Sequence, residues 1–505
     1  MINQLSLKKN IMVSYASQTY VVLIGILILP FYIGTMGAEA YGLIGFFAIL
    51  QTWFNLLDVG LIPTIGRETA RMRAGAYDSI TYIRLFRALN IIFILIAIIG
   101  SGILLITSGI IADKWLHAEL LSISEIHFAL KIMSISVALR WMSGLYRGVI
   151  SGSEELVWLG GYNAIMVTLR FLIVFPVMWE LGATITVFFT YQLAIAIVEF
   201  IGLLIKSKSL LPHITSSQAN NIGWSIKPIK SILGFSLSIA LTSVIWTLVT
   251  QTDKLIMSNL LSLTNYGYFT LAVLVASGIM MISSPISSAI MPRMVKLDAE
   301  GKYDDMIYIY RQSTQIVTVI AGSISIILAG FAEPILYVWT GDAYIASVAA
   351  PIMRLYAIGY GILAVGAFPY YLQYAKGKLK LHIIGNILFV LILMPTLFWA
   401  TERYGMIGAG YAWLFVNLLY FAVWTYVVHY AYAKGIHMQW MRDIIFLIFL
   451  PIFMAYVFQG TIQASSRIMM LVEILGVGGI ILLSSILSSE TVRNVVLKKF
   501  KKLST

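Results

Sequence analysis

The chain has 505 residues, of which 60% are hydrophobic and only 11% are charged, and its mean hydropathy is +0.89. Because soluble globular proteins carry about 25% charged residues, this composition excludes a water-soluble protein and indicates an integral membrane protein. The net charge of +12 lies in short loops between apolar stretches, as in cytoplasmic loops, and the absence of cysteine excludes disulfides and thiolate chemistry.

The N-terminal stretch predicts a retained membrane span, because Lys8 and Lys9 precede an apolar run that is too long for a signal peptide and has no small-residue cleavage site. A span needs about 20 apolar residues. By this criterion we expect fourteen spans: 11–34, 41–65, 88–111, 124–146, 157–179, 182–205, 231–257, 264–291, 312–331, 343–373, 381–400, 404–428, 444–459 and 467–488.

The distribution of Lys and Arg supports this count. With the N-terminus in the cytoplasm, the inside segments hold 26 of the 34 Lys and Arg, the outside segments hold 4, and 4 lie within spans. Cytoplasmic loops of membrane proteins carry such an excess of Lys and Arg over outside loops. It predicts fourteen spans with both termini inside.

A weak internal repeat suggests two lobes. Tyr41-Gly42 and Tyr266-Gly267 lie 225 residues apart, and each pair is followed about one span later by an inside Arg. Because this offset covers six spans, an even number, the halves are expected to be parallel repeats around a central site. We therefore expect an all-α membrane protein with an N-terminal lobe (1–205), a basic cytoplasmic linker (206–230), a C-terminal lobe (231–430), and two additional helices with a basic tail (431–505).

Three arginines fall inside the expected spans. Arg170 and Arg354 lie deep, Arg354 just after Pro351, and Arg140 lies nearer an inner end. Ionisable residues at such depth normally face protein or a wet cavity and mark a transport path. We therefore expect them to bind an anionic substrate; the alternatives are an ion pair with another helix, or snorkelling.

The seventh span carries a polar stripe that ends in a cation. Ser236, Ser243, Thr247, Thr250 and Lys254 recur at helical spacing, which places them on one helix face. We expect this face to line a wet cavity with Lys254 near its outer end. The alternative is an interfacial Lys254 paired with its neighbour Asp253.

Acidic residues inside the spans are candidates for coupling transport to a proton or cation gradient. These are Asp58, Glu199 and Asp253. The alternative for Asp58 and Glu199 is a structural role, as a partner of Arg140 or Arg170 or as a helix cap.

Motifs of soluble catalytic and nucleotide-driven machinery are absent from the sequence. It has no GxxxxGK[ST], HExxH or GxSxG, and its six histidines are scattered. We therefore expect neither an enzyme nor a cofactor nor a metal site.

Four stretches resemble the bacterial polysaccharide and O-antigen flippases (Wzx-type) of the multidrug/oligosaccharidyl-lipid/polysaccharide exporter superfamily. They are "GAEAYGLIGFFAILQTW" (37–53), "LLDVGLIPTIGRETARMRAG" (56–75), "LYRGVISGSEEL" (145–156) and "TDKLIMSNLLSLTNYGYFTLA" (252–272). The resemblance implies two six-helix lobes around a central cavity plus two C-terminal helices. It also implies alternating access that moves an undecaprenyl-pyrophosphate-linked oligosaccharide between leaflets, coupled to a proton or ion gradient.

The resemblance extends to location and partners. It implies a multi-pass protein of the bacterial cytoplasmic membrane, here expected as a monomer that binds no nucleic acid, with a polysaccharide polymerase and a chain-length regulator as candidate partners. Two other functions stay open: a cation-coupled drug or metabolite exporter of the same superfamily, and a lipid II flippase. A cavity rich in acidic groups would favour export of cationic drugs, whereas basic intramembrane residues favour an anionic substrate.

Overall fold

The computed structural model describes residues 16–21, 23–75, 78–212, 227–462, 466–490 and 492–493. Regular structure in this part of the chain is helical, apart from one isolated bridge between His117 and Ser262. The predicted all-α membrane fold is therefore confirmed. The start of the first expected span, most of the basic linker 206–230 and the basic tail lie outside the described residues.

Contacts divide the chain into two compact units, Met1–Gln251 with Ser262–Gly267, and Thr252–Leu261 with Tyr268–Thr505. Residues up to Gln251 of the seventh expected span thus group with the first unit. The two lobes predicted from the loop pattern, 1–205 and 231–430, are not tested by this division into units and stay a prediction.

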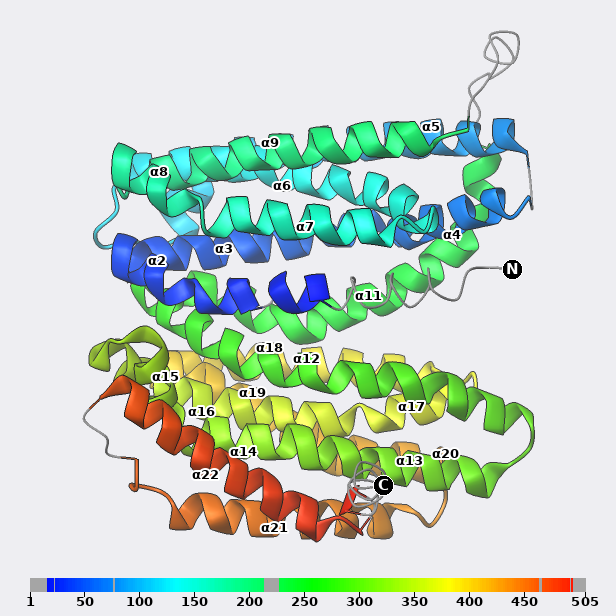
Figure 1. Ribbon diagram of the computed structural model, residues 1–505, viewed down its shortest axis with the longest axis vertical. Coiled ribbons are helices and arrows are strands. Elements are labelled where there is room, and N and C mark those ends of the chain that lie inside the picture. Colours follow the sequence, from blue (N-terminus) through cyan, green and yellow to red (C-terminus); the bar gives the residue numbers. More distant parts are fainter. Residues whose placement is uncertain are drawn as a thin grey trace, which may run out of the picture. The chain divides into compact units, whose positions relative to one another are not determined.

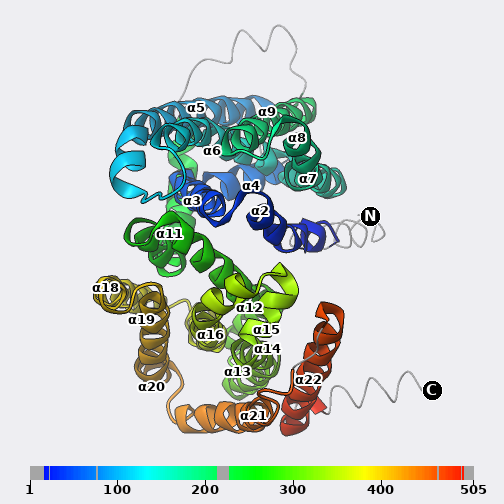
Figure 2. The same ribbon diagram turned by 90° about the vertical axis from the view of Figure 1, so that its left-hand side faces the viewer.

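The first unit is built from long helices and the breaks between them. Its named elements are α2 (Leu29–Met36), α3 (Ala38–Asn55), η1 (Leu56–Asp58), α4 (Leu61–Arg73), α5 (Ser79–Ile110), η2 (Ile111–Trp115), α6 (Ile123–Gly152), α7 (Leu156–Phe171), α8 (Val174–Leu181), α9 (Ile185–Leu210) and most of α11 (Lys227–Leu260). Figures 1 and 2 show α5, α6, α7 and α9 running side by side in this unit.

The second unit is also built from helices with breaks between them. Its elements are most of α12 (Leu263–Ala299), then α13 (Tyr303–Val317), η3 (Thr318–Gly322), α14 (Ser323–Gly330), α15 (Ala332–Thr340), α16 (Ala343–Gly366), α17 (Phe368–Ala375), α18 (Lys380–Tyr404), α19 (Met406–Leu419), η4 (Tyr420–Trp424), α20 (Thr425–Tyr432), α21 (His437–Val457) and α22 (Arg467–Ser488).

Thirteen helices among the residues searched are long and apolar enough to cross a membrane. They match thirteen of the fourteen expected spans, and the remaining one, 231–257, falls on α11, a single 34-residue helix. The multi-pass membrane architecture is thus confirmed, while the count of fourteen stays a prediction.

The second expected span, 41–65, is wrong as a continuous helix. α3 ends at Asn55, a short 3₁₀ turn follows, and Val59 and Gly60 take left-handed φ angles of 48° and 72° before α4 begins. The Asp-Val-Gly sequence explains the break, because glycine adopts positive φ without steric cost.

Helix α6 is the centre of the first unit and packs against α3, α4, α5, α7 and α9. It starts at a capping box between Ser122 and Glu125, which satisfies backbone donors at the helix N-terminus. Near its other end, a Cβ on Gly148 would lie 2.9 Å from the carbonyl oxygen of Ile62, so this glycine lets α4 approach closely. The position of α6 matters because it carries two of the arginines described next.

Candidate functional site

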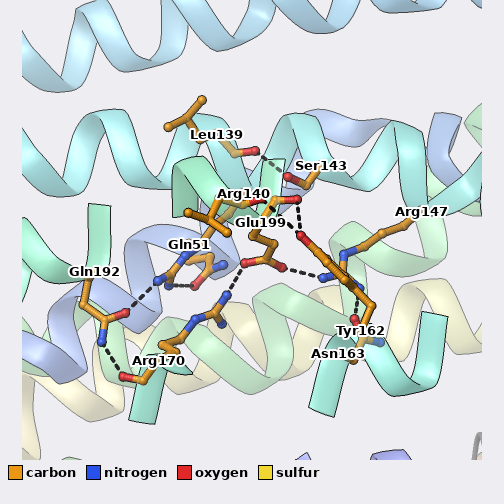
Figure 3. Close-up of polar contacts among 11 residues, drawn as sticks. Gln51, Leu139, Arg140, Ser143, Arg147, Tyr162, Asn163, Arg170, Gln192 and Glu199 are labelled. Carbon is orange, nitrogen blue, oxygen red and sulfur yellow. Dashed lines mark hydrogen bonds and ion pairs between the residues drawn. The ribbon is translucent and has the colours of Figure 1, made fainter. Parts of the chain in front are cut away.

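Three helices of the first unit bring charged side chains together inside the membrane-spanning region. Arg147 on α6 and Arg170 on α7 each form an ion pair with Glu199 on α9, one to each carboxylate oxygen (Figure 3). Glu199 is only 5% exposed. We refer to Arg140, Arg147, Arg170 and Glu199 as the arginine cluster.

Arg140 joins the cluster through amides rather than through the carboxylate. Its Nη2 donates to Oε1 of Gln192 at 2.8 Å, and its Nη1 to Oε1 of Gln51 at 3.5 Å. Its guanidinium also lies 5.1 Å from the ring centroid of Phe47, a cation–π distance. Gln192 is 3% exposed, so these contacts are made in a largely dehydrated place.

Tyr162 and Asn163 of α7 complete the surroundings. The Arg147 guanidinium also donates to the side-chain oxygen of Asn163, while the Tyr162 hydroxyl donates to the carbonyl oxygens of Val198 and Glu199 at 3.1 Å each. The Tyr162 contacts join α7 to the backbone of α9, and the Asn163 contact joins α7 to Arg147 of α6. Additional hydrogen bonds therefore hold the helices that carry the arginine cluster.

The cluster lies well inside the expected bilayer. Arg170 is the fifteenth residue of the candidate span Leu156–Leu181, about 21 Å from its start at 1.5 Å per residue. It combines three guanidinium groups with one carboxylate, an excess of two positive charges. Because a buried charge without a partner is costly, this excess favours a bound anion.

Two of the predicted substrate-binding residues, Arg140 and Arg170, and one predicted coupling residue, Glu199, thus come together. Their pairing is also the structural alternative that the sequence left open. Arg147 was missed because the expected span 124–146 ends just before it, whereas α6 continues to Gly152. Its spacing of seven from Arg140, two helical turns on one face, was the signal that could have identified it.

A second buried polar group lies in the second unit. Asp253 is 0% exposed, and its Oδ2 accepts a hydrogen bond of 2.7 Å from the hydroxyl of Tyr356 on α16. Its Oδ1 has no hydrogen-bond partner among the described residues. Tyr356 stacks on Trp413 of α19 with ring centroids 5.4 Å apart. Asp253 is thus a buried carboxylate, and its role in ion coupling stays a prediction.

The other two predicted cations also belong to the second unit. Lys254 is partly exposed, although its neighbour Asp253 is fully buried, as successive residues of a helix point in different directions. Arg354 is exposed within the candidate span Ala343–Ala375. An exposed arginine at such a position requires water or an anion rather than lipid.

Asp58 has a local structural role. Its Oδ1 accepts a hydrogen bond of 2.8 Å from the backbone N–H of Ile62, so it caps the first turn of α4, which was the structural alternative for this residue. Its role in ion coupling stays a prediction.

The polar stripe of the seventh span meets several environments. Ser236 is buried and hydrogen-bonded to Thr64 of α4 at 2.8 Å, whereas Ser243 is exposed. Thr247 is partly exposed, and Thr250 is 8% exposed and donates to the carbonyl of Trp246 in its own helix. Whether this face lines a cavity stays a prediction. Among the residues searched, no group of three or more His, Asp or Glu side chains could hold a metal ion.

The chain is similar in sequence to known proteins of polysaccharide export. The family described as "Polysaccharide biosynthesis protein" matches residues 163–349. A protein of Shigella flexneri named "Putative O-antigen transporter" is 21% identical over 393 residues, which cover 77% of this chain and 90% of that protein. These are similarities over part of the chain for the family and over most of it for the Shigella flexneri protein.

Solved structures show the same fold. The lipid II flippase MurJ, in an inward closed conformation, has a TM-score of 0.73 at 14% identity and covers 96% of this chain and 99% of its own. An inward-facing multidrug resistance MATE family transporter of the MOP superfamily has a TM-score of 0.68 at 12% identity, over 85% of this chain and 95% of its own. The chain is thus a multi-pass membrane protein with the fold of these two proteins.

Proposed function

We propose that the protein moves undecaprenyl-pyrophosphate-linked oligosaccharide repeat units from the inner to the outer leaflet of the bacterial cytoplasmic membrane. The comparisons support an O-antigen or polysaccharide flippase of the MOP superfamily. The lipid carrier, the direction and the location in this membrane with both termini in the cytoplasm are our proposal. A polysaccharide polymerase and a chain-length regulator are its proposed partners, and the chain acts as a monomer.

The single observation that carries the proposal is the arginine cluster. A diphosphate that links a lipid to a sugar carries a negative charge on each phosphate, which matches the two positive charges that Glu199 leaves uncompensated. Arginine can bind phosphate oxygens in a bidentate manner. Lys254 and Arg354 of the second unit stay proposed substrate ligands in their own right, as a point charge and a guanidinium. A cationic drug, in contrast, would be repelled by this cluster.

We propose that transport proceeds by alternating access of the two predicted lobes, driven by a proton or cation gradient. Glu199 occupies guanidinium groups that a diphosphate also requires, so its protonation would release Arg147 and Arg170 to the substrate. Asp253 is the other leading coupling residue, because it is a fully buried carboxylate in an expected span and its Oδ1 has no hydrogen-bond partner among the described residues. Asp58, which is held as a cap, is the third.

Two other functions fit the fold. The likeness to MurJ fits a lipid II flippase, and the likeness to a MATE family transporter fits a drug exporter. Lipid II also carries a diphosphate, so the arginine cluster does not separate it from an O-antigen intermediate. The match to the Shigella flexneri protein favours the polysaccharide pathway.

The decisive experiment is lipid extraction from cells that lack the gene. Undecaprenyl-pyrophosphate oligosaccharides are identified by mass spectrometry, and their leaflet is assigned by the access of an impermeant sugar-oxidising reagent. Cells in which the initiating glycosyltransferase is also blocked serve as the control for pathway origin, and restored wild-type cells as the control for the gene.

We expect repeat units to accumulate on the cytoplasmic leaflet, to be absent from the control and to clear when the gene is restored. Accumulation of lipid II with loss of peptidoglycan would instead establish the lipid II function. Normal surface polysaccharide without trapped intermediates, together with greater drug sensitivity, would establish the exporter.

A further inference from the structure

The helix that carries Arg170 breaks immediately after this residue. α7 ends at Phe171 and α8 begins at Val174, with Leu172 and Ile173 in a turn between them. Pro176 explains the break, because a proline has no N–H to donate to the carbonyl four residues earlier and its ring clashes with that carbonyl. Within a membrane, a broken helix requires other donors for the carbonyl groups that it frees.

Three side chains donate to the carbonyl groups at this break. The Tyr191 hydroxyl donates to Leu169 O at 2.7 Å, Gln192 Nε2 to Arg170 O at 3.0 Å, and the Tyr32 hydroxyl to Phe171 O at 3.1 Å. Tyr191 and Gln192 are neighbours on α9, and Tyr32 comes from α2. The break is therefore held in a defined geometry rather than left to solvent.

Gln192 does more than satisfy one carbonyl. Its Nε2 donates to the backbone of Arg170, while its Oε1 accepts from the Arg140 guanidinium at 2.8 Å (Figure 3). The orientation of this amide is determined by its partners, because a guanidinium only donates and a carbonyl only accepts. One buried amide thus sets the position of Arg140 relative to the backbone that carries Arg170.

We propose that Gln192 is a positioning residue that fixes the separation of the Arg140 and Arg170 guanidinium groups so that they bind the two phosphates of a diphosphate together. This inference rests on the proposed function, and it deepens it. Without the two hydrogen bonds of Gln192, Arg140 keeps its charge and its contact with Phe47, but its position relative to Arg170 is no longer fixed. The preference for a diphosphate over a monophosphate then falls, because only a diphosphate needs both guanidinium groups at a set distance.

The test measures binding of undecaprenyl pyrophosphate and undecaprenyl phosphate to the purified full-length protein in lipid nanodiscs. Gln192→Leu removes both hydrogen bonds with little change in volume, and Gln192→Glu keeps the acceptor for Arg140 but loses the donor to Arg170. Tyr191→Phe is the matched control, because it removes a donor to the same helix break without touching Arg140. Thermal unfolding of each variant reports on the structural cost.

For Gln192→Leu we expect the Kd for the diphosphate to rise about tenfold, the effect of losing one hydrogen bond to a charged group, and the Kd for the monophosphate to change much less. Tyr191→Phe should lower the unfolding temperature similarly while keeping the preference for the diphosphate.

Equal loss of affinity for both lipids in Gln192→Leu, or an unchanged preference, would overturn the positioning role. Failure of the proposed function looks different, since the wild-type protein would then bind neither lipid, or would bind both equally. The wild-type measurement therefore separates the two failures.

Discussion

Gly42 of α3 and Gly267 of α12 lie against each other within the first unit, so the two Tyr-Gly pairs that the sequence places 225 residues apart meet in space. A Cβ on Gly267 would lie 3.2 Å from the backbone nitrogen of Gly42 and would overlap the carbonyl oxygen of Ala38. Only glycine permits this closeness, because backbone atoms cannot move aside as a flexible side chain can.

We predict that Gly267→Ala lowers stability by about 1–3 kcal/mol, the usual cost of overpacking a tight contact. The unfolding temperature of the purified protein measures this change. Gly34→Ala is the matched control in the same unit, since its Cβ would meet nothing within 4 Å. Equal unfolding temperatures for the two variants would contradict the close packing at Gly267.

Glu199→Gln should destabilise the first unit. It leaves Arg147 and Arg170 without their shared carboxylate, and breaking a buried ion pair costs about 3–5 kcal/mol. The partial exposure of the two arginine side chains, 29% and 16%, places the expected loss at the lower end of this range or below it. The double variant Arg147→Gln/Glu199→Gln should recover part of the loss, and a double-mutant cycle on unfolding temperatures checks this; strictly additive losses would argue against the pairing.

Lys254→Ala should weaken export while Lys254→Arg largely preserves it, because the predicted contribution is a positive charge near the substrate. Surface polysaccharide in cells with matched protein levels is the measurement. Normal export by the Ala variant would remove Lys254 from the substrate site.

Asp253→Asn should uncouple transport from the gradient with little effect on the fold, since the amide retains the size of the carboxylate and still accepts the hydrogen bond from Tyr356. Uptake in proteoliposomes with an imposed proton or sodium gradient tests this. Glu300→Gln is the control for loss of a carboxylate, because Glu300 lies outside the candidate spans and pairs with Lys302. If Asp253→Asn still responds fully to the gradient, the coupling role belongs elsewhere.

Arg354→Ala should raise the Kd for undecaprenyl pyrophosphate about tenfold, as expected for one lost charge-assisted hydrogen bond. Arg354→Lys should fall between Ala and wild type, because lysine keeps the charge but not the bidentate geometry. Titration in nanodiscs provides both values, and equal affinity of all three proteins would exclude a contact with the diphosphate.

The sequence identified several residues of the candidate site, but it did not show which of them contact one another. Depth in an apolar stretch singled out Arg140, Arg170 and Glu199, because charge at such depth is rare and costly. Arg147 was not predicted, because the expected span ended before it. Helices can extend past the apolar stretch that defines a span, and α6 continues to Gly152. Gln192 gave no signal, because a neutral amide in a span is unremarkable until its two partners are known.

The sequence by itself determined that this protein is a helical, multi-pass membrane protein with basic groups inside its spans, because bilayer thickness and the cost of burying charge act on short stretches of chain. Only the tertiary structure decided which buried charged groups meet: Glu199 pairs with both Arg147 and Arg170, and Asp253 accepts a hydrogen bond from Tyr356. These contacts join different helices, and their geometry depends on packing and helix breaks that no local pattern specifies.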